Sequence, residues 1–191
     1  LCLVQVAFAE EPVYFADPLL KDAVERYLWI TDPTPSDMLG LTELRREGDW
    51  DFEEGEAIAD LTGLEYATNL RTLHLRLNRI GDLSPLSGLT NLESINLSEN
   101  RITDLSPLSG HDRLTYVNLH ANDIVDLSPL AGLTHVTTLI LRFNQISDLS
   151  PLSGLTSLRE LDLGDNPLED LSPLSSLTHL TTLCLWSSGV R

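Results

Sequence analysis

Residues 83–104 read LSPLSGLTNLESINLSENRITD, and the same arrangement of leucine, asparagine and aspartate returns 22 residues later. Six such units run from Leu61 to Arg191, and the last of them is truncated. Their bounds are 61–82, 83–104, 105–126, 127–148, 149–170 and 171–191. A fixed period of this length is the signature of a fold in which similar coils stack along one axis.

Each position of the repeat has a physical role. The segment L-x-x-L-x-L alternates in its second half, as a strand with one buried side does. One coil cannot bury its own apolar face, so neighbouring coils must share a leucine interior. The asparagine after each strand, as at Asn78 and Asn100, has an amide that can satisfy backbone groups where the chain turns.

Each of the first five units ends with an aspartate, and the next unit begins with L-S-P-L. We expect the serine to cap a short helical turn, with the proline in its first position. Aspartates that stand singly, one coil apart, do not make a cage of ligands for a metal ion. No metal and no cofactor is therefore expected.

The repeated segments D-L-S-P-L and L-x-x-N-x-I-x-D resemble the 22-residue leucine-rich repeats of bacterial internalin-like proteins. The resemblance covers residues 61–191 well and residues 15–60 loosely. It implies an α/β solenoid, a right-handed leucine-rich-repeat superhelix with a parallel concave β-sheet. The convex side would be 3₁₀ or extended, and an N-terminal helical cap would precede the repeats. The family's usual role implies that the concave face recognises a protein ligand.

Residues 10–40 are expected to form the N-terminal helical cap. Asp17-Pro18 is typical of a helix start, and Leu20, Val24 and Leu28 then recur at helical spacing. A second short helix is expected at 35–39. Terminal coils need such a cover because their apolar interior would otherwise face water.

Residues 41–60 resemble an irregular first repeat with an acidic insertion at 45–57, about seven residues longer than a regular coil. The insertion carries Trp50 and Phe52. Loops on a rigid scaffold often carry function, so these two aromatics are possible contacts with a ligand. The alternative is that they fold back onto the cap.

Residues 1–9 resemble the remnant of a signal peptide cleaved after Ala9, with the small residues Ala7 and Ala9 at the third-last and last positions before cleavage. A short apolar strand or a disordered start is the alternative. The expected location is secreted, periplasmic or at the cell surface. No segment has the ~20 apolar residues that cross a bilayer, so no membrane span is expected.

The formal net charge is −17, and the chain has 29 acidic residues against 12 lysines and arginines. Such a surface repels the phosphates of nucleic acid and anionic membranes, so neither is expected as a partner. It would suit a basic partner, although a solvated acidic surface explains the composition more simply than a dedicated docking site does.

The strand residues that alternate with the leucines should form lanes of variable side chains on the concave face. Exposed aromatics beside arginine are typical of a binding hot spot, with incidental surface variation as the alternative. An open strand surface has no pocket that excludes water, so we expect no enzyme, even though Glu160 and Asp162 share a face. The predicted ligand contacts are Tyr116, His120, Ile140, Arg142, Phe143, Glu160, Asp162 and Trp186.

The sequence thus predicts a protein–protein recognition module. One alternative is a structural, spacer or assembly domain of a longer bacterial surface protein, and another is the inhibitory subunit of an enzyme. Ser188 replaces the turn asparagine in the last unit, which motivates the assembly alternative. Either residues 186–191 blunt that edge or another segment or subunit covers it. A monomer is expected unless the C-terminal edge pairs.

Overall fold

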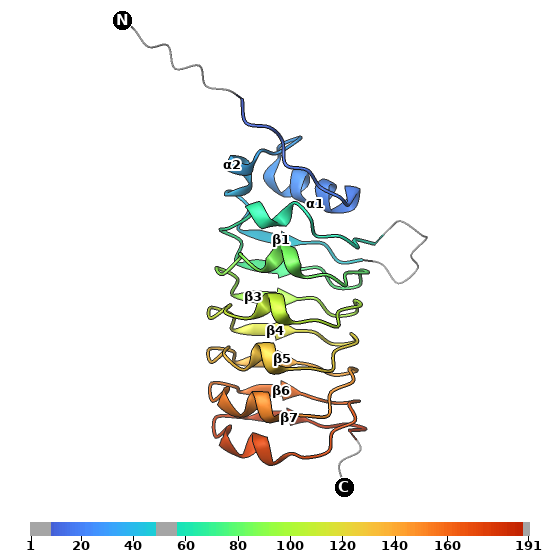
Figure 1. The fold of residues 1–191 in the computed structure, drawn as a ribbon, viewed down its shortest axis with the longest axis vertical. Coiled ribbons are helices and arrows are strands. Elements are labelled where there is room, and N and C mark those ends of the chain that lie inside the picture. The colour runs from blue at the N-terminus through green and yellow to red at the C-terminus, as the bar shows by residue number, and fades with distance from the viewer. Residues whose placement is uncertain (1–8, 49–56, 189–191) are drawn as a thin grey trace, which may run out of the picture.

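The computed structural model describes residues 9–48 and 57–188 of the chain. Its coils stack along the long axis of the molecule, with α1 (Pro18–Leu28) and α2 (Pro35–Met38) at the N-terminal end (Figure 1). Trp50, Phe52 and most of the expected signal-peptide remnant lie outside the described residues.

One parallel sheet runs the length of the stack, and each of its strands pairs with the next strand in the sequence. The strands are β1 (Glu43–Arg45), β2 (Thr72–His74), β3 (Ser94–Asn96), β4 (Tyr116–Asn118), β5 (Thr138–Ile140), β6 (Glu160–Asp162) and β7 (Thr182–Cys184). The 3₁₀ helices are η1 (Leu64–Tyr66), η2 (Ser84–Leu86), η3 (Ser106–Leu108), η4 (Ser128–Leu130), η5 (Ser150–Gly154) and η6 (Ser172–Ser176). The predicted leucine-rich-repeat solenoid is confirmed.

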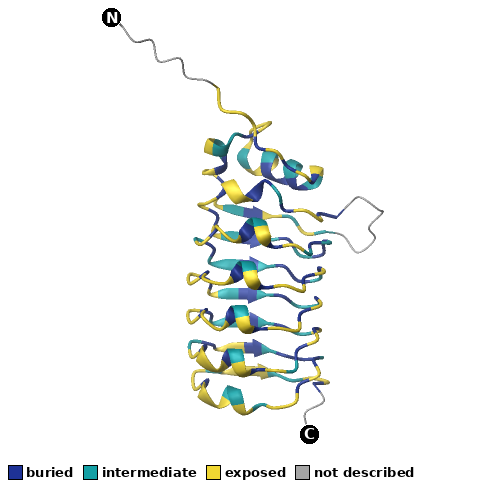
Figure 2. Cartoon of the chain, in the orientation of Figure 1, coloured by how far each residue is buried: buried dark blue, intermediate teal, exposed yellow. Residues whose placement is uncertain are grey.

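The interior of the stack is a column of apolar side chains. Each strand from β1 to β6 contributes its central residue, and these residues lie in register across the sheet. Burial recurs from coil to coil along the strands (Figure 2). The strand centres that are at most 1% exposed are Leu44, Leu73, Ile95, Val117, Leu139 and Leu161. Full burial of such a side chain contributes about 1.5–3 kcal/mol, so this column is the main source of stability.

Asparagines join each coil to the coil before it. Nδ2 of Asn100 donates to the carbonyl oxygens of Leu75 and Leu97, both at 3.0 Å. Its Oδ1 accepts the N–H of Ile80 at 3.0 Å. The same arrangement recurs at Asn122, Asn144 and Asn166. The prediction that these amides satisfy backbone groups at the turn is confirmed, and each amide also reaches the preceding coil.

The aspartate before L-S-P-L, and not the serine, accepts the hydrogen bonds at the start of each 3₁₀ helix. In the second regular coil, Asp104 accepts the N–H and the hydroxyl of Ser106 at 2.8 and 2.7 Å. These two bonds hold the pKa of Asp104 below its ordinary value. The expectation that the serine caps this turn was wrong, because its hydroxyl is a donor to the carboxylate. The proline does occupy the first turn, as at η3.

The helical cap is attached to the first coil by Asp17. Its Oδ1 accepts the N–H groups of Leu19 and Leu20, at 2.8 and 3.3 Å, and so begins α1. Its Oδ2 accepts the N–H of Ala59, which lies at the end of the first coil, at a distance of 2.8 Å. Leu20 and Val24 are fully buried against the column of leucines. The second helix, α2, ends at Met38, one residue before the expected end.

Candidate functional site

The strand residues that point away from the leucine column form two rows, here called the outer sheet face, which the sequence predicts as the concave face. One row is Glu43, Thr72, Ser94, Tyr116, Thr138, Glu160 and Thr182. The other row is Arg45, His74, Asn96, Asn118, Ile140, Asp162 and Cys184. Their register is the one expected from the repeat, so neighbours in a row are about 4.8 Å apart.

A residue in the left-handed backbone region follows each strand of the repeats and precedes the turn asparagine, or Ser188 in the last unit. This conformation is unusual for residues other than glycine. It lets the chain leave the strand and turn into the next coil. The residues are Leu77, Glu99, Ala121, Phe143, Asp165 and Ser187, with φ between 51 and 58°.

Some positions expected to lie free on this surface are buried. Leu77 is 8% exposed and Ser98 is 2% exposed. Ser98 donates its hydroxyl to Oδ1 of Asn96 at 2.8 Å, so its small side chain is held against the sheet. The expectation that the variable positions beside and after the strands lie free on the surface was therefore wrong at Leu77 and Ser98.

Three predicted contact residues, together with Asp165, form a group that we call the Phe143 cluster: His120, Arg142, Phe143 and Asp165. The rings of His120 and Phe143 meet edge to face, with centroids 5.5 Å apart. The Arg142 guanidinium lies over the Phe143 ring, 4.7 Å from its centroid, and its Nε donates to Asp165 at 2.9 Å. Phe143 is still 48% exposed, so a large apolar surface faces solvent beside a fixed cation.

Gly164 makes room for the Arg142 side chain. A Cβ atom at position 164 would lie 3.3 Å from Cγ of Arg142 and 3.3 Å from Oδ1 of Asp162. Both contacts are tighter than ordinary packing allows. The glycine also donates its N–H to Oδ1 of Asp162 at 3.0 Å. The small residue thus fixes the carboxylate of Asp162 and the arginine stem on the same surface.

A second group, which we call the His74 cluster, consists of Arg45, His74, Ser94 and the predicted contact residue Tyr116. The rings of His74 and Tyr116 have centroids 6.3 Å apart. Nη1 of Arg45 lies 2.6 Å from Nδ1 of His74, and arginine only donates, so Nδ1 must be the acceptor. The proton of the neutral ring is then on Nε2, 3.0 Å from the hydroxyl of Ser94. Burial, and next the charge of Arg45, lower the pKa of His74.

The other predicted contact residues extend the surface toward the C-terminal coils. Ile140 pairs with Asp162 in the register of β5 and β6 and is partly exposed. Glu160 is exposed on the neighbouring row, and Trp186 is 71% exposed after β7. The surface therefore runs from an aromatic and cationic part around Phe143 to an acidic part at β6.

Within residues 9–48 and 57–188, no three histidine, cysteine or acidic side chains are grouped so that they could hold a metal ion. Neither described helix has the length and apolar character needed to cross a membrane.

Comparison with known proteins agrees with this architecture. A family model described as "Leucine Rich repeats (2 copies)" matches residues 68–110 and 156–190, and one described as "Leucine rich repeat" matches residues 112–168. The crystal structure of an internalin, InlF, from Listeria monocytogenes superposes with a TM-score of 0.84 at 33% identity. The chain belongs to the internalin-like leucine-rich-repeat family. The superposition covers 93% of this chain and 52% of InlF, so the internalin-like chain spans about half the length of InlF.

Two further structures resemble this internalin-like chain. Internalin C2 of Listeria monocytogenes has a TM-score of 0.50 at 28% identity, over 94% of this chain and 99% of its own. A leucine-rich-repeat protein of Leptospira interrogans has a TM-score of 0.59 at 28% identity, over 64% of this chain and 33% of its own. Among curated protein sequences, no match to this chain is found.

Two residues of the His74 cluster were not predicted from the sequence of this internalin-like chain. Arg45 and His74 were not among the predicted contacts, although they pair across β1 and β2. They are 29 residues apart because the insertion lengthens the first coil beyond the regular period. Aligning Leu44 with Leu73 would have placed Arg45 directly beside His74. Leucine-rich-repeat folds generally serve protein–protein interaction, and the chain shares that fold.

Proposed function

We propose that this internalin-like chain is a recognition module that binds a protein partner through the outer sheet face. The observation that carries the proposal is the Phe143 cluster. It combines a phenylalanine that is 48% exposed with an arginine held over the ring by an ion pair to Asp165. Exposed aromatic and arginine side chains of this kind are the usual anchors of protein interfaces.

The surface around the cluster supports a partner with both apolar and basic side chains. Phe143 and Ile140 offer apolar area, while Glu160 and Asp162 lie on the next strand and carry negative charge. A basic side chain of the partner could pair with either carboxylate, and the overall charge of −17 would accelerate its approach.

The Phe143 cluster contributes little to holding the fold together. The ion pair between Arg142 and Asp165 joins side chains that are 39% and 21% exposed, and such pairs contribute about 0–1 kcal/mol. Phe143 packs on the surface and not in the leucine column. Side chains that are not needed for folding but present an ordered apolar surface are well suited to recognition.

A pull-down with matched variants tests the proposal. The immobilised chain is compared with an Arg142→Glu/Phe143→Ala variant, using extracellular material as the source of partners. The control is Arg113→Glu/Val125→Ala, which makes the same kinds of change at exposed residues outside the strands. Partners should be lost from the first variant and kept by the control. Equal capture by all three chains would contradict recognition by this face and favour assembly through another surface.

The proposed partner lies outside the cytoplasm, with this chain secreted, periplasmic or at the cell surface. The Ala7–Ala9 pattern supports this proposal, because small residues at those two positions are typical of signal-peptide cleavage sites. Fractionation of cells that produce the chain, followed by immunoblotting, tests it. Recovery of the chain in the cytoplasmic fraction alone would contradict it.

A further inference from the structure

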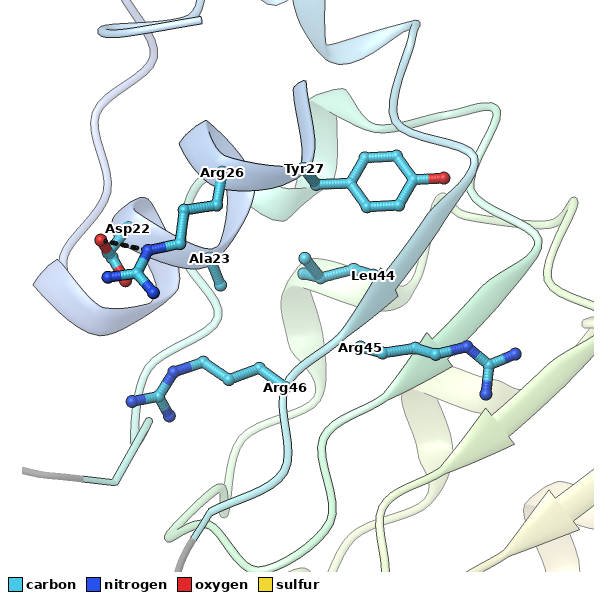
Figure 3. A pocket seen from close by; sticks show the side chains of 7 residues that line it. All are labelled: Asp22, Ala23, Arg26, Tyr27, Leu44, Arg45 and Arg46. Carbon is cyan, nitrogen blue, oxygen red and sulfur yellow. Dashed lines mark hydrogen bonds and ion pairs between the residues drawn. The ribbon is translucent and has the colours of Figure 1, made fainter. Parts of the chain in front are cut away.

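A pocket of about 320 Å³ lies between the helical cap and the end of the first strand. One wall is α1, with Asp22, Ala23, Arg26 and Tyr27, and the other is residues 44–46. Figure 3 shows these side chains. The volume is at the lower end of the range for small-molecule pockets, so it suits a single side chain better than a large ligand.

Two of the three arginines that line this pocket already have ionic partners. Nε of Arg26 donates to Asp22 at 3.0 Å. Arg45 forms an ion pair with Glu43 and donates to His74 on the outer sheet face. In Figure 3, Arg45 extends away from Asp22 and Arg26, whereas Arg46 extends toward their side of the pocket.

Arg46 is the exception. Its Nη1 is buried and has no hydrogen-bond partner among the described residues. Arg46 also takes part in none of the ion pairs formed among the described residues. A partly buried guanidinium with an unsatisfied nitrogen is unfavourable, and native structures rarely keep one without a reason. The backbone of Arg46 is well held, since its N–H donates to His74 O at 2.9 Å.

We propose that this pocket binds the carboxylate of an acidic peptide side chain, with Arg46 as its main ligand. A guanidinium binds a carboxylate through two parallel hydrogen bonds, and Nη1 of Arg46, which has no partner among the described residues, is a donor for one of them. Arg26 and Arg45 already pair with Asp22 and Glu43, so of the three arginines Arg46 alone is left without an ionic partner among the described residues, and a singly charged carboxylate balances it. Ala23 and Leu44 give the apolar stem of the side chain a surface to pack on.

Nuclear magnetic resonance titration of the full chain tests this proposal. N-acetylglutamate α-methylamide, whose only charge is the side-chain carboxylate, is the probe; N-acetylglutamine α-methylamide is its neutral isostere, and inorganic phosphate is the second anion. Saturable shifts are expected at the amides of Ala23 and Arg46, with affinity for the neutral isostere about tenfold weaker because the charge-assisted bonds are lost. Arg46→Gln should abolish the shifts, whereas Arg101→Gln, which removes the same charge at an exposed site, should keep them.

Thermal unfolding of each variant keeps the comparison valid. Arg46→Gln should unfold at the same temperature as the wild type or higher, because it removes an unsatisfied charge. If it fails to fold, Arg46→Lys retains the charge without the planar fork and should show weakened binding in its place.

Three outcomes would overturn the proposal. The first is the absence of saturable shifts in the wild type, and the second is equal binding by Arg46→Gln. The third is tighter binding of phosphate than of N-acetylglutamate α-methylamide. A further variant tests whether the chain's own acidic residues compete for the pocket. In it, the aspartates and glutamates at positions 49, 51, 53, 54 and 56 are replaced by asparagine and glutamine. If that variant binds the probe and the wild type does not, the chain's own acidic residues are the occupant of the pocket, and an external peptide is excluded.

Discussion

The side-chain oxygen of Asn122 accepts the backbone N–H of Ile102 from the preceding coil, at a distance of 2.9 Å. The amide nitrogen of the same asparagine donates to Leu97 O and Leu119 O, at 3.0 and 3.1 Å. One buried side chain therefore completes three backbone groups that belong to two coils. No other side chain of this size offers both a donor and an acceptor in this geometry.

Replacing Asn122 with alanine should destabilise the chain by roughly 3 kcal/mol, because buried backbone groups lose their partners at about 1–3 kcal/mol each. Unfolding in urea, followed by circular dichroism, measures the change. Asn91→Ala is the matched control, since Asn91 makes one exposed bond to Thr68 O at 2.8 Å and should cost no more than about 1 kcal/mol. Equal losses in the two variants would contradict the role given to the turn asparagines.

His111 occupies a position that is leucine in the neighbouring repeats, and it is fully buried. Its Nε2 lies 3.1 Å from Leu86 O, but its Nδ1 has no partner among the described residues. His111→Leu should stabilise the chain by about 1–2 kcal/mol, since an unsatisfied polar atom is removed and Leu86 O keeps the bond from Leu89 N–H. The same urea experiment measures this gain, and a loss of stability would show that the histidine is the better fit.

The fold could be predicted from the sequence almost completely, whereas the site could not. Leucines at a fixed spacing determine the register of the coils, so each strand residue's neighbours followed from the period. Pairing of Arg45 with His74 did not follow from the period, because the long first coil breaks it; only the alignment of Leu44 with Leu73 gives that pairing. The direction in which Tyr116 leans also depends on side-chain packing, which a repeat pattern does not contain. The buried Ser98 illustrates the same limit, since its burial results from a hydrogen bond to Asn96.

The stability of the chain should depend on pH through His74. Burial and the charge of Arg45 lower the pKa of His74 in the folded chain below its ordinary value near 6.5. The unfolded chain therefore binds more protons below that pH, so this contribution to the unfolding free energy is intact above about pH 6.5 and decreases as the pH falls.

Unfolding of the wild type and of His74→Gln should be compared from about pH 7.5 to pH 5. As the pH falls over this range, the unfolding free energy of the wild type should decrease relative to that of the variant. His179→Gln is the control, because His179 is exposed. A constant difference between the wild type and His74→Gln would contradict the lowered pKa.

Phe143→Asn separates recognition from folding. Phe143 has a φ of 54°, in the left-handed region, which asparagine adopts more readily than phenylalanine. The variant should be as stable as the wild type to within about 0.5 kcal/mol, yet it should lose the exposed aromatic surface. We expect normal urea unfolding together with loss of the partners captured by the wild type. A clear loss of stability would instead assign Phe143 to the folding core.

Site-specific photo-cross-linking tests the central claim most directly. A photoreactive phenylalanine analogue is placed at position 143, and in a separate chain at position 125, where Val125 is 57% exposed outside the strands. After exposure to extracellular material and irradiation, a covalent adduct with a partner protein should form from position 143 and not from position 125. An adduct formed from position 125 but not from position 143 would contradict recognition by the outer sheet face.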